Sequence, residues 1–332
     1  MLRKLFCLLL VGGHALAQTA DAPAAAPPAA SIPAAATATS TATDTTKPSA
    51  SNITRVGGSD LLQTAIGEPL SRYVRQYHLN VAVDMLGSVP ALTGLKTGKI
   101  QIAIIAAPLG QRPAPADFTS IPLCFQVDYL VVSEQNPINT LNLRQIADIY
   151  GSVQEDASYW GQLQLTGEWV SRPIIPYSTS ADDGIVLELF KNLILGRQTL
   201  KVTVRLAKTT AELIAQVSDN PNYIGLCGYD PGPPLKVLII SSDQTSSTTA
   251  RALIASQSKG AFAPNADTVF KGDYPLRLPF YLVFKSTDKE RVLPLLRLLL
   301  SDDYAKHLED EHFMPVPSAE RARALLELDN SP

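Results

Sequence analysis

The sequence predicts an α/β fold that is divided into two lobes. Strand and helix patterns alternate along the folded part of the chain, as they do in sheets covered by helices on both faces. The folded part also comprises about 280 of the 332 residues, which is more than a single hydrophobic core usually holds. We therefore expect one chain with two α/β units.

The first half of the folded part begins with a short strand at 54–59 that runs into a Gly-Gly turn. Residues 61–77 then carry apolar side chains at helical spacing, with Ser59 or Asp60 as the cap. Further strands are expected at 81–86, 100–106 and 125–132, and a helical turn at 90–96. This order predicts a mostly parallel sheet with helices on both faces.

The second half continues the alternation and then returns to the first lobe. Helices are expected at 142–150, 183–195, 209–217 and 289–308, and strands at 174–175, 202–206, 223–227, 237–241 and 279–284. The last strand follows Tyr274-Pro275, since a proline cannot donate a ladder hydrogen bond and stands at a strand start. We expect the chain to cross between lobes near 127–132 and to come back near 274–284.

The first residues of the chain indicate export. Arg3 and Lys4 precede a short apolar run at 5–11, and residues 15–17 form a small-x-small cleavage site. The apolar run is too short for a membrane span, which needs about 20 residues. We interpret residues 1–17 as a cleavable signal peptide that directs the protein to a bacterial periplasm or beyond it.

The mature chain is expected to begin near Gln18 with a linker. Residues 18–52 consist almost entirely of Ala, Pro, Thr, Ser and Asp and contain no aromatic side chain. Such a segment buries too little apolar area to offset the entropy of ordering it. The composition therefore predicts a disordered linker, which is either a functional spacer or simply an unstructured N-terminus.

The composition also argues against several kinds of site. The net charge is −3, and no Lys/Arg cluster or aromatic-basic stripe indicates a nucleic-acid surface. His307 and His312 fall outside metal-ligand spacing, so no metal or other cofactor is expected. Cys124 and Cys227 are compatible with a disulfide in an oxidising compartment and equally with two separate buried thiols.

Nothing in the sequence suggests catalysis. No His accompanies a Ser or Cys motif, and no phosphate-cradling glycine loop is present. The pair Asp182-Asp183 is more typical of a helix N-terminus than of an acid/base dyad. We therefore do not expect an enzyme.

Several short motifs occur in a fixed order along residues 53–320. They are Gly58-Ser59, Gly87-Ser88 followed by Leu95 and Gly98, the segment 102–109, Asn136-Pro137, the segment 143–151 followed by Trp160, Tyr223-Ile-Gly225, Tyr274-Pro275 and Phe313-Met-Pro-Val-Pro317. In this order they resemble the phosphate-type periplasmic solute-binding proteins. The resemblance implies a two-lobed periplasmic-binding-protein fold with two crossover strands and an interlobe cleft. Lobe 1 would comprise 53–127 and 275–328, and lobe 2 would comprise 128–274.

The resemblance also implies where a ligand binds. In this family an oxyanion lies between the lobes, held by N–H groups at helix starts, by Ser/Thr hydroxyls, by an Arg and by a carboxylate. The matching ligand-binding residues here are Ser59 and Ser88 in lobe 1 and Ser178, Thr179 and Ser180 in lobe 2.

Several family positions are changed in this chain. Ala106 stands at the carboxylate position and Ser180 at the Arg position, and Pro90 removes a donor from the turn after Ser88. Arg172 is the only nearby cation that offers a replacement. The resemblance therefore implies a degenerate phosphate site.

The function implied is capture of a small anionic or polar solute for the membrane component of an ABC transporter. Phosphate is expected to bind weakly, no nucleic acid is expected to bind, and the protein is expected to be a monomer. The alternative is a non-transport periplasmic or cell-surface interaction protein that reuses the two-lobed scaffold.

Overall fold

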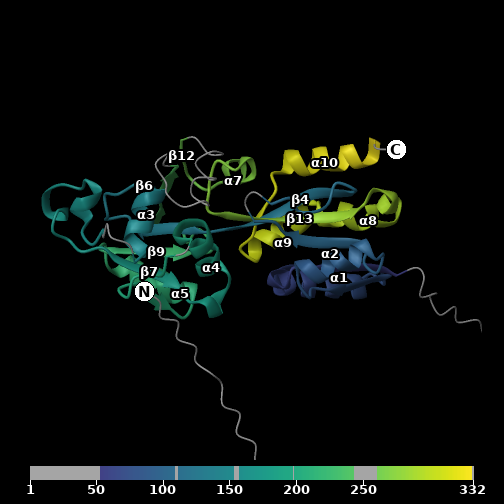
Figure 1. Ribbon diagram of the computed structural model, residues 1–332, viewed down its shortest axis with the longest axis horizontal. Coiled ribbons are helices and arrows are strands. Elements are labelled where there is room, and N and C mark those ends of the chain that lie inside the picture. The colour runs from purple at the N-terminus through teal and green to yellow at the C-terminus, as the bar shows by residue number, and fades with distance from the viewer. Residues whose placement is uncertain (1–52, 109–110, 153–156, 197, 243–259, 331–332) are drawn as a thin grey trace, which may run out of the picture. The chain divides into compact units, whose positions relative to one another are not determined.

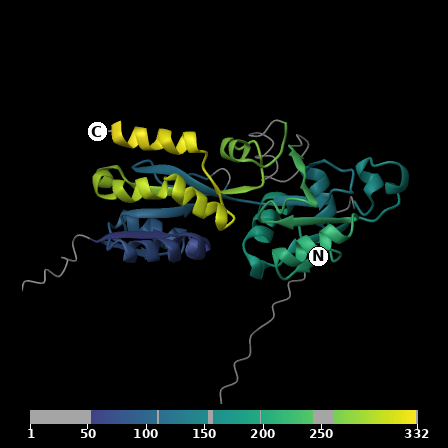
Figure 2. The same cartoon turned by 180° about the vertical axis from the view of Figure 1, so that it is seen from behind.

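The computed structural model describes residues 53–108, 111–152, 157–196, 198–242 and 260–330. The predictions for the signal peptide at 1–17 and the linker at 18–52 lie outside these residues. The described part is built on two larger sheets and one small sheet, with helices packed against them (Figures 1 and 2). The predicted α/β class is confirmed.

The six-stranded sheet has the order β14-β4-β13-β3-β1-β2. Its strands are β1 (Thr54–Gly58), β2 (Val81–Asp84), β3 (Ile102–Ala106), β4 (Phe118–Val127), β13 (Arg277–Lys285) and β14 (Met314–Pro315). Strand β1 pairs in parallel with β2 and β3, whereas β13 lies antiparallel between β3 and β4. The prediction of a mostly parallel sheet is wrong, because a strand from far along the sequence enters the sheet in the opposite direction.

The five-stranded sheet has the order β10-β5-β9-β7-β8. Its strands are β5 (Tyr129–Ser133), β7 (Ile175–Thr179), β8 (Arg205–Ala207), β9 (Tyr223–Cys227) and β10 (Leu235–Val237). Strands β8, β7 and β9 run parallel, and β5 is antiparallel to β9 and β10. A small third sheet joins β6 (Thr140–Asn142), β11 (Ile239–Ser241) and β12 (Ala261–Phe262).

The helices follow the strands that they cover. They are α1 (Glu68–Gln76), α2 (Ser88–Lys96), α3 (Leu143–Tyr150), α4 (Val186–Phe190), α5 (Thr210–Asp219), α7 (Ala266–Lys271), α8 (Lys289–Leu299), α9 (Asp302–Asp310) and α10 (Ser318–Asn330). Helix α2 packs on β1 and β3, and α5 packs on β5, β7 and β9. The approach of α2 to β1 is close, since a Cβ on Gly57 would lie 3.4 Å from Ala91 Cβ, and it would lie 2.4 Å from Ile100 Cδ1 in the segment before β3. Glycine at position 57 therefore makes room for Ile100.

Three helices that the sequence predicted as continuous are interrupted. The segment 61–77 becomes a 3-10 turn, a π turn and then α1. The segment 183–195 becomes α4 followed by a π turn. The segment 289–308 splits into α8 and α9, because Ser301 Oγ accepts a hydrogen bond from Tyr304 N–H at 3.2 Å and starts a new helix.

The predicted strand at 125–132 is in fact two strands that belong to different sheets. Strand β4 ends at Val127, which pairs with Arg277 of β13. Strand β5 starts at Tyr129, which pairs with Cys227 of β9. The chain thus passes from the six-stranded to the five-stranded sheet across a single residue, Asp128. The periodicity of apolar side chains does not reveal this change of partner, because both strands are buried.

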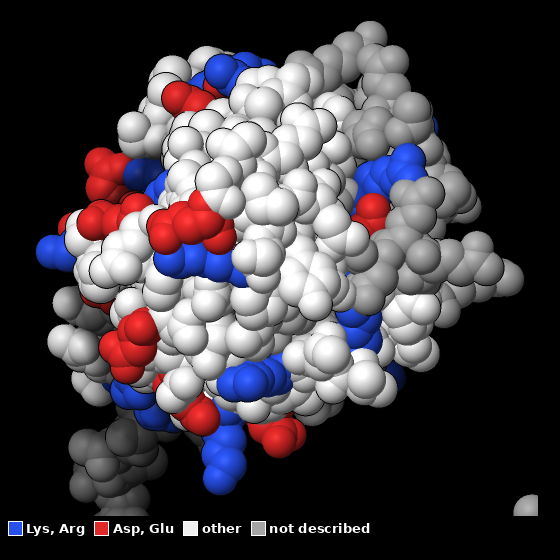
Figure 3. Space-filling view, turned by 90° about the vertical axis from the view of Figure 1, so that its left-hand side faces the viewer, with Lys and Arg blue, Asp and Glu red and all other residues white. Residues whose placement is uncertain are grey.

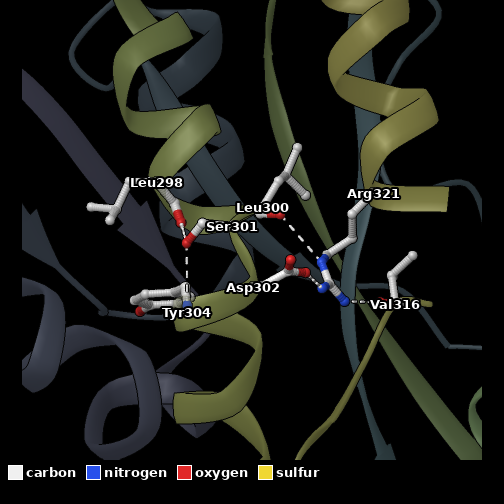
Figure 4. A network of polar contacts seen from close by, with 7 residues as sticks. All are labelled: Leu298, Leu300, Ser301, Asp302, Tyr304, Val316 and Arg321. Atoms are coloured by element: carbon white, nitrogen blue, oxygen red, sulfur yellow. Dashed lines mark hydrogen bonds and ion pairs between the residues drawn. The ribbon is translucent and has the colours of Figure 1, made fainter. Parts of the chain in front are cut away.

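Helix α10 is tied to the turn between α8 and α9 by one buried arginine (Figure 4). Arg321 Nε donates to Leu300 O at 3.2 Å, Nη1 donates to Val316 O, and Nη2 pairs with the Asp302 carboxylate. In Figure 2 helices α10 and α8 lie beside one another, and residues of the two are in contact. This network fixes the C-terminal helix to the turn between α8 and α9 and to Val316, the residue that follows β14.

Candidate functional site

Ser59 directly follows β1. Its N–H donates to Ile104 O at 2.8 Å, and its carbonyl accepts from Leu62 N–H at 3.1 Å. The residue is buried, and its hydroxyl makes no capping hydrogen bond to the turn that follows. The alternative that Ser59 merely caps its own helix is therefore wrong.

Ser88 is the first residue of α2, which begins two residues before the helical turn predicted at 90–96, and it lies at the same sheet edge as Ser59. Its Oγ accepts a hydrogen bond from the N–H of Ala106 at 3.2 Å. The preceding Gly87 has φ of 122°, a conformation that favours glycine, and its N–H donates to Gly58 O at 2.8 Å. These bonds join the carboxyl ends of the three parallel strands β1, β2 and β3.

The start of α2 offers few donors to a ligand. The first N–H groups of an α-helix have no intrahelical partner, but Pro90 at the third position has none to give. The side chains of Leu86 and Val89 flank this turn and are 69% and 75% exposed. The sheet edge at which Ser88 was expected to contact an anion therefore presents apolar surface.

The second predicted group follows β7. Ser178 and Thr179 are buried, and Ser178 Oγ donates to Thr179 O at 3.0 Å. The N–H of Ser180 donates to Ala207 O at 2.8 Å, and its carbonyl accepts from Asp183 N–H at 3.1 Å. Several polar groups of this turn are thus engaged within their own sheet.

Asp183 caps a neighbouring helix. Its Oδ2 accepts hydrogen bonds from both the N–H and the Oγ1 of Thr210, each at 2.7 Å, where α5 begins. A carboxylate at a helix start is favourable for the helix dipole. The interpretation of Asp182-Asp183 as helix N-terminal charges is confirmed for Asp183, although the helix is α5 and not α4.

Arg172, the candidate replacement for the family's arginine, is engaged in other contacts. Its guanidinium forms an ion pair with Glu168 at 3.0 Å and lies 4.4 Å from the centre of the Trp169 ring. From Arg172 to Lys191 the sequence contains no other cation, and both sheet edges carry exposed aspartates such as Asp84. These aspartates are unfavourable for a dianion, whereas Lys208, which follows the β8 residue paired with Thr179, places a positive charge near the second group.

The five predicted residues fall into two groups, one at the end of β1 and β2 and one at the end of β7. A cavity of about 870 Å³ includes none of them. It is lined by Tyr129 and Tyr229, by parts of α9 and by the 312–318 segment, and the Tyr229 and His312 rings stack at 4.0 Å. His312 has φ of 65°, which is unusual for a residue other than glycine. The sequence reasoning missed this cavity.

Sequence reasoning also missed Asp128, the residue at the crossing. It is buried, and burial raises the pKa of its carboxyl well above the usual value. The signal that could have revealed it is a lone carboxylate inside the mostly apolar run 123–132.

The thiols of Cys124 and Cys227 are not joined by a disulfide. Cys124 on β4 and Cys227 on β9 are both buried and unpaired, which settles the alternatives that the sequence left open.

Among the described residues, no group of three or more His, Cys, Asp or Glu is placed to hold a metal ion. None of the helices described in the structure has the length and apolar character needed to cross a membrane. On the face in Figure 3, cationic and anionic residues are interspersed among uncharged ones.

Comparison with known proteins gives a consistent result. Residues 35–303 match the family model described as PBP superfamily domain. The chain is 24% identical over 301 residues to the phosphate-binding protein PstS of Pseudomonas aeruginosa, which covers 84% of this chain and 87% of that protein. Among solved structures, PstS from Borrelia burgdorferi has a TM-score of 0.61 at 18% identity, covering 80% of this chain and 99% of that one. An ABC-type phosphate transport receptor from Vibrio cholerae has a TM-score of 0.54 at 19% identity, covering 79% and 99%.

Proposed function

Because the chain belongs to the PBP superfamily domain family, we propose that it is a substrate-binding protein of the phosphate-binding type. It would capture a small anionic or polar solute for an ABC transporter. The observation that carries this proposal is the agreement of fold and family over both sheets, since the two-lobed fold is shared with solved phosphate-binding relatives. The relatives act in binding and transport, and we propose that this chain likewise binds a solute without catalysis.

We propose that the solute lies in a cleft between lobe 1, formed by 53–127 and 275–328, and lobe 2, formed by 128–274. The membership of the strands in two separate sheets supports this division. The proposed contacts are Ser59 and Ser88 on one side and 178–180 on the other. Ser59 Oγ is not used in capping, which leaves it able to bind a ligand.

The site we propose is degenerate toward phosphate. Ala106 and Ser180 take the places of a carboxylate and an arginine, and Pro90 removes a backbone donor. The engagement of Arg172 with Glu168 and Trp169 supports the same conclusion. We therefore propose a solute with less negative charge than phosphate.

The proposed location is the periplasm, reached by a signal peptide at 1–17, and the proposed state is a monomer that meets a transporter membrane component. The second candidate is a periplasmic or cell-surface protein that retains the scaffold for partner contacts. The exposed apolar side chains of Leu86 and Val89 beside the α2 start favour this alternative. A protein partner would cover these side chains, whereas a small polar solute would not.

The experiment is equilibrium binding of the mature protein to phosphate, sulfate and a panel of small metabolites. A solute that binds should lose affinity in the double variant Ser59→Ala/Ser88→Ala. The matched control is Ser286→Ala, an exposed serine whose hydroxyl contacts Thr119. If the double variant binds a confirmed solute as the control does, the proposed site is misplaced. If no solute binds, the interaction protein is the better interpretation.

A further inference from the structure

Asp128 is the one residue between β4 and β5. Its peptide group joins the two segments through which the chain passes between the lobes, residues 127–129 and 274–276, which together form the crossing. Its N–H donates to Leu276 O at 2.9 Å, and its carbonyl accepts from Tyr274 Oη at 2.7 Å. Tyr274 is itself fully buried. The segment that leaves lobe 2 therefore binds, through these two bonds, to the residue at which the chain enters it.

The side chain of Asp128 is in a different situation from its peptide group. It is 0% exposed, and within the described residues neither carboxyl oxygen has a hydrogen-bond partner. An isolated ionised carboxylate in such surroundings is so unfavourable that the group binds a proton instead. The crossing therefore contains a carboxyl that is stable there in its neutral form.

Among the residues that the structure describes, the groups that interact with Asp128 supply no positive charge. From the returning segment it faces the phenol of Tyr274, and from β9 the thiol of Cys227, while the neighbouring Tyr129 carries another phenol. Each of these is neutral near pH 7, and burial raises the pKa of all three. The nearby Arg277 donates instead to a carbonyl of α7 and stacks over an aromatic ring of β4.

We propose that Asp128 is a proton-binding site within the crossing, and that loss of this proton opens the contacts between residues 127–129 and 274–276. Residues 127–129 join the six-stranded sheet to the five-stranded sheet, and residues 274–276 lead from α7 back into β13 of the six-stranded sheet. The proton therefore controls the hinge between the sheets. This inference is independent of which solute, if any, the protein binds.

The sign of the pH dependence follows from the two states of the carboxyl. In the closed crossing it keeps its proton above the ordinary aspartate pKa of about 3.9, whereas in an open crossing it meets water and releases it. Between these two pKa values the opening equilibrium constant rises about tenfold per pH unit, and above the higher pKa it becomes constant. The crossing is tightest in acid and loosens as the pH rises.

The test is hydrogen exchange of the full chain, followed by mass spectrometry at several pH values and corrected for the intrinsic pH dependence of exchange. In the wild type, protection of peptides covering 125–132 and 274–280 should fall by up to about tenfold per pH unit. In Asp128→Asn, which cannot ionise, the corrected protection should not depend on pH. The control Asp117→Asn alters an exposed aspartate just before β4 and should keep the wild-type slope.

Equal slopes in wild type and Asp128→Asn would overturn the proposal. If Asp128→Asn does not fold, an NMR titration of the wild type alone tests whether Asp128 keeps its proton. In protein labelled with carbon-13 at aspartate carboxyls, one NMR resonance should remain in the protonated position after the others have ionised. Titration of every aspartate near about 3.9 would overturn the proposal equally.

Discussion

Replacing Arg321 by methionine should loosen the C-terminal helix (Figure 4). The guanidinium donates to two buried carbonyls, those of Leu300 and Val316, and pairs with Asp302. Methionine keeps the apolar stem of the side chain but donates nothing. The variant therefore isolates the loss of polar contacts from the loss of packing.

The expected magnitude follows from these contacts. A hydrogen bond from a charged group contributes about 1.5–3 kcal/mol, so two such bonds amount to about 3–6 kcal/mol of unfolding free energy. The ion pair adds little, because the Asp302 side chain is 88% exposed. The control Arg323→Met lies on the same helix, is 69% exposed and pairs only with Glu320 and Glu327 among the described ion pairs. Because its ion pairs are exposed and screened by solvent, this control should leave the free energy of unfolding close to that of the wild type.

The assay is urea unfolding followed by circular dichroism, with hydrogen exchange of residues 318–330 as the local measurement. Tryptophan fluorescence is unsuitable, because Trp160 and Trp169 lie in the segment between β6 and β7. Arg321→Met should lower the unfolding midpoint and deprotect α10. If it differs from Arg323→Met by less than about 1 kcal/mol, the network does not hold the helix.

Three further predictions concern other parts of the chain. Asp183→Ala removes the acceptor for Thr210 at the start of α5 and should cost about 0.5–2 kcal/mol in urea unfolding; an unchanged midpoint would contradict this. Neither Cys124 nor Cys227 should react with iodoacetamide in the folded protein, because burial raises the pKa of both thiols, that of Cys227 to about 12, whereas both should react in denaturant. Labelling of the native protein would show that these strands open. The intact mass of exported protein should correspond to a chain that begins near Gln18, and retention of the first residues would refute the signal peptide.

The sequence predicts where helices and strands lie better than it predicts which strands pair in a sheet. The buried strand β3 follows from its apolar character alone, and α2 begins within two residues of the helical turn predicted at 90–96. The insertion of β13 between β3 and β4 does not follow from such patterns, because it joins segments at least 150 residues apart through backbone bonds that carry no local signal. For the same reason the change of sheet at Asp128 was predicted only as a region.

The candidate site shows the same limit. Family order indicates which turns to inspect, and the structure confirms that Ser59 and Ser88 lie at one sheet edge. It also shows that Asp183 and Arg172 serve other contacts, which depends on where Thr210 and Trp169 lie in space. Such side-chain partnerships arise from tertiary packing, and spacing along the chain does not encode them.

Calorimetric titration of the mature protein with phosphate, after removal of any bound solute, tests the degenerate site most directly. The proposed loss of the arginine at Ser180 and of the carboxylate at Ala106 would remove two charge-assisted contacts, or about 3–6 kcal/mol. Measured beside the phosphate-binding protein PstS of Pseudomonas aeruginosa, this chain should bind phosphate about two to four orders of magnitude more weakly. A sub-micromolar phosphate affinity would contradict the account.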